Sequence, residues 1–142
     1  MILTEQKKGV AMAANEEKSR WQFLNEEAKA GRLYLDASVA KSCRDASNKQ
    51  IDLFKTLKGD LRRLSTVTGL GRFNCSDQLA KMLGMKAVGG ERDFDTAFTE
   101  HIEVLELIRD TIEISVKKYE DQQLAQTAAT NNKADDLDNG GK

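Results

Sequence analysis

The amino-acid composition of the chain predicts an all-α protein. The 142-residue chain has no proline, 32% of its residues are charged, and only 6% are aromatic. This balance favours long helices over a turn-rich β fold. The length fits a single domain, so we expect a helical hairpin domain over residues 15–126. A flexible N-terminus over 1–14 and a disordered C-terminal tail over 127–142 are expected to flank it.

The first half of the chain predicts a short lead helix and a long amphipathic one. Residues 15–30 contain good helix formers around Trp21, and Gly31 follows as a helix stop. Asp36 can accept backbone N–H bonds at the start of the next helix, which extends to about residue 64. Its apolar positions recur mainly at three- and four-residue steps. They are Val39, Cys43, Ala46, Leu53, Leu57, Leu61 and Leu64.

The second half predicts a loop, a short helix and a second long helix. Residues 66–74 contain two glycines and no helical period, which is typical of a loop. Ser76 is expected to cap a short helix that ends at Gly89 and Gly90, and Asp93 to cap the last helix. Leu79, Met82 and Leu83 share one face of the short helix. The seam of the last helix is Phe94, Phe98, His101, Leu105, Ile108, Ile112, Ser115 and Tyr119.

Opposite net charges on the two long helices favour their pairing as an antiparallel hairpin. Residues 36–68 contain seven basic and four acidic residues, whereas residues 91–126 contain four basic and ten acidic ones. The apolar arc of the last helix is wider than one partner helix covers. The short helix and the Trp21 region can cover part of it, and we expect a second chain to cover the remainder in a four-helix bundle. The interface candidates are Phe94, Phe98, Leu105, Ile108, Ile112, Leu53, Leu57 and Leu61.

The residue types that perform catalysis or hold metals do not form a pattern here. His101 is the only histidine, and a carboxylate-bridged di-metal bundle would need a second one and a Glu in place of Phe98. No nucleophile-turn motif is present. We therefore predict no enzyme activity, no metal and no cofactor. Cys43 and Cys75 are expected to be mostly buried thiols, with a single bridge between them as the alternative.

Charge and hydropathy also argue against nucleic-acid and membrane partners. The net charge is −1, so no global field attracts a polyanion. A broken basic stripe on the first long helix lacks interleaved aromatic residues, and the acidic last helix accounts for it; we predict no nucleic-acid binding. Residues 122–132 are the longest charge-free stretch, too short and too polar for membrane insertion.

The start of the chain indicates the cellular location of the protein. It lacks the apolar core and cleavage site of a classical signal peptide, so we expect a cytoplasmic protein, or one secreted without such a peptide. Met12 precedes a small-residue and acidic stretch, which makes it an alternative first residue to Met1.

The stretches AGRLYLDASVAKSCRDA, GLGRFNCSDQLAKMLGMKAVGG and HIEVLELIRDTIEISVKKYE, taken in this order, resemble the ESX-like, type VII secretion-associated small helical proteins of actinobacteria. These are architectural relatives of the hundred-residue Trp-X-Gly proteins. The resemblance covers about residues 30–126 and implies a dimerising helical hairpin that is exported or escorts a larger toxin. It also implies a Tyr-x-x-x-Asp/Glu export signal, of which Tyr119 matches the tyrosine while Gln123 stands at the acidic position. No Trp-X-Gly turn is present.

Three function classes therefore remain open; the third, after the two given next, is an enzyme or a nucleic-acid binder. The first is a secretion-associated substrate or adaptor, with a second helical hairpin, a secretion ATPase or a toxin as its partner. The second is a structural or regulatory helical bundle without an export role. Whether the partner hairpin is an identical or a different chain is open in both.

Overall fold

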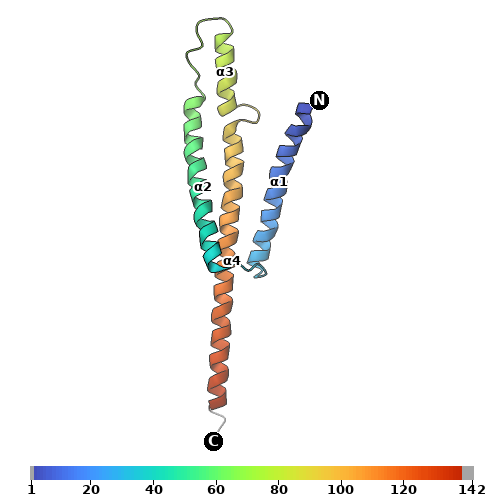
Figure 1. Ribbon diagram of the computed structural model, residues 1–142, viewed down its shortest axis with the longest axis vertical. Helices are drawn as coiled ribbons and strands as arrows, with labels where there is room; N and C mark the ends of the chain where they lie inside the picture. The colour runs from blue at the N-terminus through green and yellow to red at the C-terminus, as the bar shows by residue number, and fades with distance from the viewer. Residues whose placement is uncertain (1, 139–142) are drawn as a thin grey trace. The chain divides into compact units, whose positions relative to one another are not determined.

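The computed structural model describes residues 2–138, and the side chains of residues 15–134 within them (Figure 1). These residues form four helices: α1 (Ile2–Lys29), α2 (Ala37–Leu64), α3 (Ser76–Ala87) and α4 (Phe94–Asp138). The described part of the chain has no strand, so the predicted all-α class is confirmed.

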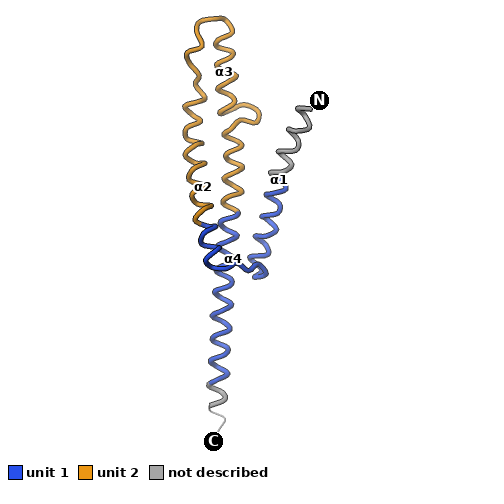
Figure 2. The backbone as a smooth tube through the Cα atoms, in the orientation of Figure 1, with its two compact units in different colours: residues 1–44, 108–142 blue, residues 45–107 orange. Residues whose placement is uncertain are grey.

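The helices are distributed over two compact units, coloured separately in Figure 2. Unit 1 consists of residues 1–44 and 108–142, and unit 2 of residues 45–107. Helices α2 and α4 contribute to both units, α1 belongs to unit 1 and α3 to unit 2. The single hairpin domain predicted over 15–126 is therefore divided into two units in the structure.

Three of the predicted helix ends are confirmed by backbone geometry and hydrogen bonds. The Asp36 carboxylate accepts the backbone N–H groups of Ser38 at 2.9 Å and Val39 at 3.2 Å, which caps α2. Asp93 accepts the N–H of Thr96 at 2.9 Å at the start of α4. Gly31 ends α1 with a φ of 72°, a left-handed conformation that glycine adopts without steric cost.

Ser76 has a different role from the predicted helix cap. Cys75 occupies the cap position and its side chain makes no capping bond. The Ser76 hydroxyl instead donates to the carbonyl of Leu70 and accepts the N–H of Phe73, both at 3.1 Å. It therefore closes the preceding loop onto the first turn of α3.

Both outer helices are longer than the sequence predicts. The backbone of residues 2–14 is helical rather than irregular, and α4 continues through Asp138 where a disordered tail is predicted from residue 127. Helix-forming alanine and glutamine residues and the absence of glycine and proline between 91 and 138 explain the second extension. Met1 and residues 139–142 lie outside the described residues, as does the side chain of Met12.

In unit 1, small and polar side chains hold α1 against α4. Ala28 and Thr111 are fully buried. The Asn25 side-chain amide donates to the Thr111 hydroxyl at 3.0 Å, and the Ser115 hydroxyl donates to the carbonyl of Leu33 at 2.6 Å. Because these side chains are short, the helices approach closely, and hydrogen bonds satisfy the polar groups that this approach buries.

In unit 2, apolar and aromatic side chains hold α2 against α4. The Phe54 ring lies 5.4 Å from that of Phe98 and 4.6 Å from that of His101, measured between centroids. Two ion pairs join the helices across this contact, Lys58 with Asp95 at 3.9 Å and Lys55 with Glu106 at 3.5 Å. In both pairs α2 contributes the basic residue and α4 the acidic one. The buried apolar residues of unit 2 are Ile51, Leu61, Ala87 and Ile102.

The prediction of which side of α2 faces the interior is wrong. Leu53 and Leu57 are exposed, while the inward side carries Ser47, Ile51 and Leu61. The inward stripe is displaced sideways around the helix because the small Ser47 allows close approach and the Phe54 ring packs against α4. Only Leu61 belongs to both stripes. The exposed large apolar members of the predicted seam are Val39, Leu53, Leu57 and Leu64.

Candidate interaction surfaces

Helix α3 directs small residues toward the interior of unit 2. Ser76, Gly84 and Ala87 are buried and Ala80 is half-buried. A Cβ added at Gly84 would lie 2.1 Å from the carbonyl oxygen of Ser65, far inside van der Waals contact. The inner side of α3 therefore touches the backbone at the end of α2, and only glycine fits at this contact.

The large apolar residues of α3 face outward, and we refer to Leu79, Met82, Leu83 and Met85 as the α3 outer face. All four are exposed, and Met82 retains 65% of its accessible surface. An ordinary amphipathic helix buries its large apolar side. Helix α3 buries its small residues instead, and each of these four large side chains keeps at least 42% of its surface exposed.

The loop before α3 and the helices around it expose further apolar groups in unit 2. Phe73 is the most exposed large apolar residue among the described side chains, at 76%, and Leu70 precedes it. Where exposed apolar groups form one contiguous patch, the patch is typical of a protein-binding surface. The other exposed large apolar residues of unit 2 are Leu53, Leu57, Leu64 and Phe94.

The export-signal candidates lie together in unit 1, beside the segment that follows α1. The Gln123 side-chain amide donates to the Tyr119 hydroxyl at 2.8 Å, and the Tyr119 ring meets that of Tyr34 edge-on at 6.0 Å. The Tyr34 hydroxyl donates to the Gln122 side chain at 3.3 Å. Tyr119 keeps 38% of its surface exposed. Its ring is thus fixed on one edge and accessible on the other.

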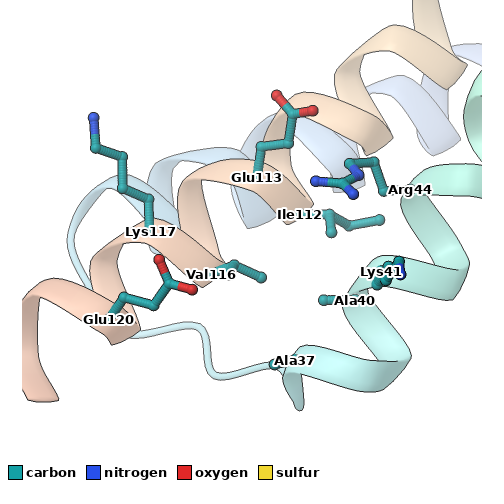
Figure 3. A pocket seen from close by; sticks show the side chains of 9 residues that line it. All are labelled: Ala37, Ala40, Lys41, Arg44, Ile112, Glu113, Val116, Lys117 and Glu120. Carbon is teal, nitrogen blue, oxygen red and sulfur yellow. The ribbon is translucent and has the colours of Figure 1, made fainter.

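A groove of about 450 Å³ opens elsewhere on unit 1, between the first two turns of α2 and residues 112–120 of α4 (Figure 3). Ile112 and Val116 point from α4 toward Ala40 of α2 and form an apolar floor. Charged side chains of both signs stand around this floor. The lining is Ala37, Ala40, Lys41, Arg44, Ile112, Glu113, Val116, Lys117 and Glu120.

Two carboxylates at helix starts have lowered pKa values. Hydrogen bonds from the Thr96 side chain and from the backbone of Thr96 and Gly89 hold the pKa of Asp93 below its usual range. The Ser38 hydroxyl and nearby backbone N–H groups do the same for the pKa of Asp36. Both shifts follow from helix capping, because an ionised carboxylate is the better acceptor.

A third carboxylate with a lowered pKa lies near the end of α1. A hydrogen bond from Arg32 lowers the pKa of Glu27, and the positive charge of the guanidinium adds to this effect. The pair ties the segment after α1 to the last turn of the helix. Like the two helix caps, Glu27 neither lines the groove nor belongs to the α3 outer face.

The predicted interface residues differ in how deeply they are buried. Leu61 and Ile112 are buried within the chain, and Phe98, Leu105 and Ile108 are half-buried. The three that remain exposed are Phe94, Leu53 and Leu57.

His101 and the two cysteines also differ from expectation. His101 contacts Phe54 as a seam residue should, yet its side chain is exposed. Cys43 and Cys75 are exposed rather than buried, and no disulfide bridge joins them. Over residues 15–134 no cluster of His, Cys, Asp or Glu has the arrangement to hold a metal ion. None of the described helices has the length and hydropathy to span a membrane.

Sequence reasoning missed the inverted orientation of α3, although a signal for it exists. Ser76, Ala80, Gly84 and Ala87 recur at steps of four, four and three, which is the spacing of a helix side that approaches backbone closely. Of the larger apolar residues, Met82 and Met85 lie on the opposite side, Leu79 and Leu83 flank the small residues, and together they dominate the hydrophobic pattern.

Comparisons of the chain with protein-family models, with curated proteins and with solved structures gave no match.

Proposed function

We propose that this protein is a non-enzymatic helical interaction module whose α3 outer face binds an amphipathic helix of a partner protein. The observation that carries the proposal is the orientation of α3, which buries its small residues and exposes Leu79, Met82, Leu83 and Met85. Methionine side chains adapt to irregular partner surfaces, which suits a docking helix.

The size of the exposed area indicates what the partner must cover. Burying the exposed halves of four large apolar side chains contributes about 4 kcal/mol, whereas micromolar affinity requires about 8 kcal/mol net. The α3 outer face alone is therefore too small. A partner that also covers Leu70 and Phe73 gains two further large side chains. A second helical hairpin, identical or different, supplies such a surface and would form the predicted four-helix bundle.

A crosslink from the outer face tests this proposal directly. A photo-crosslinking amino acid at position 82, in the full chain in its native cell, should capture a helical protein, while the same group at Glu100, which is exposed on α4 and has no exposed large apolar residue one turn away, should not. The captured protein, once purified, should bind Met82→Lys at least about tenfold more weakly than Glu100→Lys. Equal binding by the two variants would contradict the proposal.

The resemblance to type VII secretion-associated proteins supports a narrower form of this proposal. In it, the chain is a secretion substrate or targeting adaptor, and Tyr119 with Gln123 forms half of an export signal. The 2.8 Å hydrogen bond between these two side chains supports treating them as one recognition element. A secretion ATPase or a larger toxin would then be a further partner. A structural or regulatory bundle that stays in the cytoplasm is the alternative.

Export measurements separate these two forms. Tyr119→Ala should abolish export while leaving helix content nearly unchanged, and Gln123→Glu should retain export because it completes the acidic position of the motif. Tyr119→Phe keeps the ring against Tyr34 and removes only the hydroxyl, so it serves as the matched control for folding. Normal export of Tyr119→Ala would exclude the signal, and the non-exported bundle would then be favoured.

A further inference from the structure

The α3 outer face carries positive charge among its apolar side chains. Lys81 and Lys86 are the two lysines of α3, and both are exposed. Side chains three and four positions apart share one side of a helix, so Lys86 lies beside Met82 and Leu83, and Lys81 beside Met85. Among residues 15–134, neither lysine has an ion-pair partner.

The acidic residues near these lysines do not balance their charge. The positions one turn before Lys86 are apolar and those one turn after it are glycines. Asp77 is the only acidic residue of α3, and it lies one turn before Lys81. Residues 61–90 contain five basic residues and one acidic one, whereas the whole chain has a net charge of −1. The basic ones are Arg62, Arg63, Arg72, Lys81 and Lys86.

The spacing of the two lysines is that of a helix that pairs with a second helix. Met82 and Met85 are three residues apart on the side opposite the buried small residues, and the lysines flank them directly, one before Met82 and one after Met85. When two helices pack along such a seam, the flanking positions lie at its edges, where charged side chains meet those of the partner and select which partner binds. Both edges of this seam are basic.

A partner helix that covers the apolar residues also removes water from Lys86, because this side chain lies one turn after Met82 and Leu83. Removing the water around an ammonium group is unfavourable unless an opposite charge replaces it. A carboxylate on the partner supplies that charge, and a neutral or basic helix does not. The full apolar contact is therefore most favourable for a helix with acidic residues beside its apolar stripe.

We infer that the partner helix at the α3 outer face is acidic, with Asp or Glu residues on both sides of its apolar stripe that pair with Lys81 and Lys86; this inference rests on the proposed function. The same charges disfavour a contact between the α3 outer faces of two copies, since lysines would face lysines across the seam. Helix α3 has 12 residues, so the matching stretch of the partner is about 18 Å long.

Two synthetic peptides of about 21 residues, or three heptads, test the charge of the partner helix. Both have a leucine seam, and they differ only in the flanking residues, which are Glu in one and Lys in the other. In fluorescence anisotropy with the full chain at low ionic strength, the Glu-flanked peptide should bind at least about tenfold more tightly than the Lys-flanked one.

Variants of the full chain assign this difference to the two lysines. The double variant Lys81→Gln, Lys86→Gln should reduce the difference between the peptides to no more than about twofold. The control Lys117→Gln, Lys118→Gln changes the net charge equally at two exposed lysines of unit 1, and it should leave the difference in place. Equal binding of the two peptides by the unaltered chain, or a difference that the α3 double variant retains, would overturn the inference.

Met82→Gln separates this inference from the proposed function. If the apolar face is the docking site, Met82→Gln weakens binding of the Glu-flanked peptide whether or not the lysines matter, because Met82 has the most exposed side chain of the α3 outer face. Unchanged binding by Met82→Gln would overturn the proposed function and the inference together. Weaker binding by Met82→Gln with equal affinities for the two peptides would overturn the inference alone.

A lipid surface also offers negative charge, and vesicles test it. Vesicles with about 30% phosphatidylserine should sediment no more of the full chain than neutral phosphatidylcholine vesicles do. Sedimentation with the anionic vesicles that Lys81→Gln, Lys86→Gln abolishes would assign the α3 outer face to a membrane surface and overturn the inference.

Discussion

The two compact units hold their helices together with different chemistry. Unit 1 buries Asn25, Thr111 and Ser115 together with Ala28, Ala40 and Ile112, and a hydrogen bond between the short side chains of Asn25 and Thr111 joins α1 to α4. Unit 2 buries Ile51 and Ile102 and joins its helices with ring contacts and ion pairs. Hydrogen bonds fix geometry but contribute little net stability each, whereas apolar burial contributes in proportion to area.

The difference indicates which kind of partner each unit can bind. Unit 2 has more large apolar residues than its interior holds, and the excess lies on α3, the loop before it, α2 and the start of α4. Unit 1 has satisfied polar contacts and a shallow apolar groove. A partner that binds by apolar burial is therefore expected at unit 2, and one that binds by close helix approach at unit 1.

The largest effect is expected from shortening an apolar core residue of unit 2. Ile102→Ala should lower the free energy of unfolding by about 2–4 kcal/mol, because it removes buried methyl groups and leaves a cavity. Urea unfolding followed by circular dichroism measures this change. If Ile102→Ala lowers the free energy of unfolding by no more than a hydrogen-bond deletion in unit 1 does, the proposed difference in what stabilises the two units is wrong.

Gly59 and Gly84, both within helices of unit 2, offer a matched test of the α3 contact. Gly84→Ala should destabilise by about 1–3 kcal/mol, since the new Cβ would meet the Ser65 carbonyl oxygen at 2.1 Å. A methyl group added at Gly59 would have no neighbour within 4 Å, so Gly59→Ala should stabilise α2 by about 0.5–1 kcal/mol. Opposite shifts of the unfolding midpoint are expected. Equal shifts would show that α3 does not approach the end of α2.

A hydrogen-bond deletion in unit 1 should have a smaller effect. Thr111→Val preserves the side-chain volume but leaves the buried Asn25 amide without this acceptor, which costs about 1–2 kcal/mol. Thr130→Val is the control, because Thr130 is exposed and its hydroxyl bonds the carbonyl of Gln126 in its own helix. It should change stability by no more than about 0.5 kcal/mol. Similar values for the two variants would argue against a buried polar contact.

The smallest effect concerns pH and is expected in both units. Because the pKa values of Asp36 and Asp93 are lowered in the folded chain, each carboxylate stabilises the fold above its unfolded pKa of about 3.9. This contribution is lost as the pH falls through the lower folded pKa. Thermal midpoints should therefore decline below about pH 4. The decline should be shallower in the Asp36→Asn, Asp93→Asn double variant; an unchanged slope would contradict the capping roles.

The features that were predicted correctly are local in sequence. Asp36, Gly31 and Asp93 act on backbone groups within a few residues, so their roles follow from short stretches of chain. The all-α class follows from the composition of the whole chain, because it does not depend on which sides of the helices contact one another.

The features that were missed depend on which side of a helix faces the interior. On α2, both the stripe with Leu53 and Leu57 and the stripe with Ile51 and Leu61 are apolar enough to be buried. Packing of Phe54 against Phe98 decides between them, and that contact is distant in sequence. On α3 the close approach of Gly84 to Ser65 outweighs the larger apolar side, which hydrophobic periodicity cannot reveal.

The exposure of Met82 and Met85 on α3 has a chemical consequence. Thioether sulfur is oxidised readily to the sulfoxide, which is polar, and accessible methionines react first. Oxidation of Met82 and Met85 would make the apolar α3 outer face polar and hydrated, and it would leave the interior of unit 2 unchanged. Peroxide exposure should therefore weaken partner capture while leaving the unfolding transition in place, and Met82→Leu, Met85→Leu chains should resist the loss.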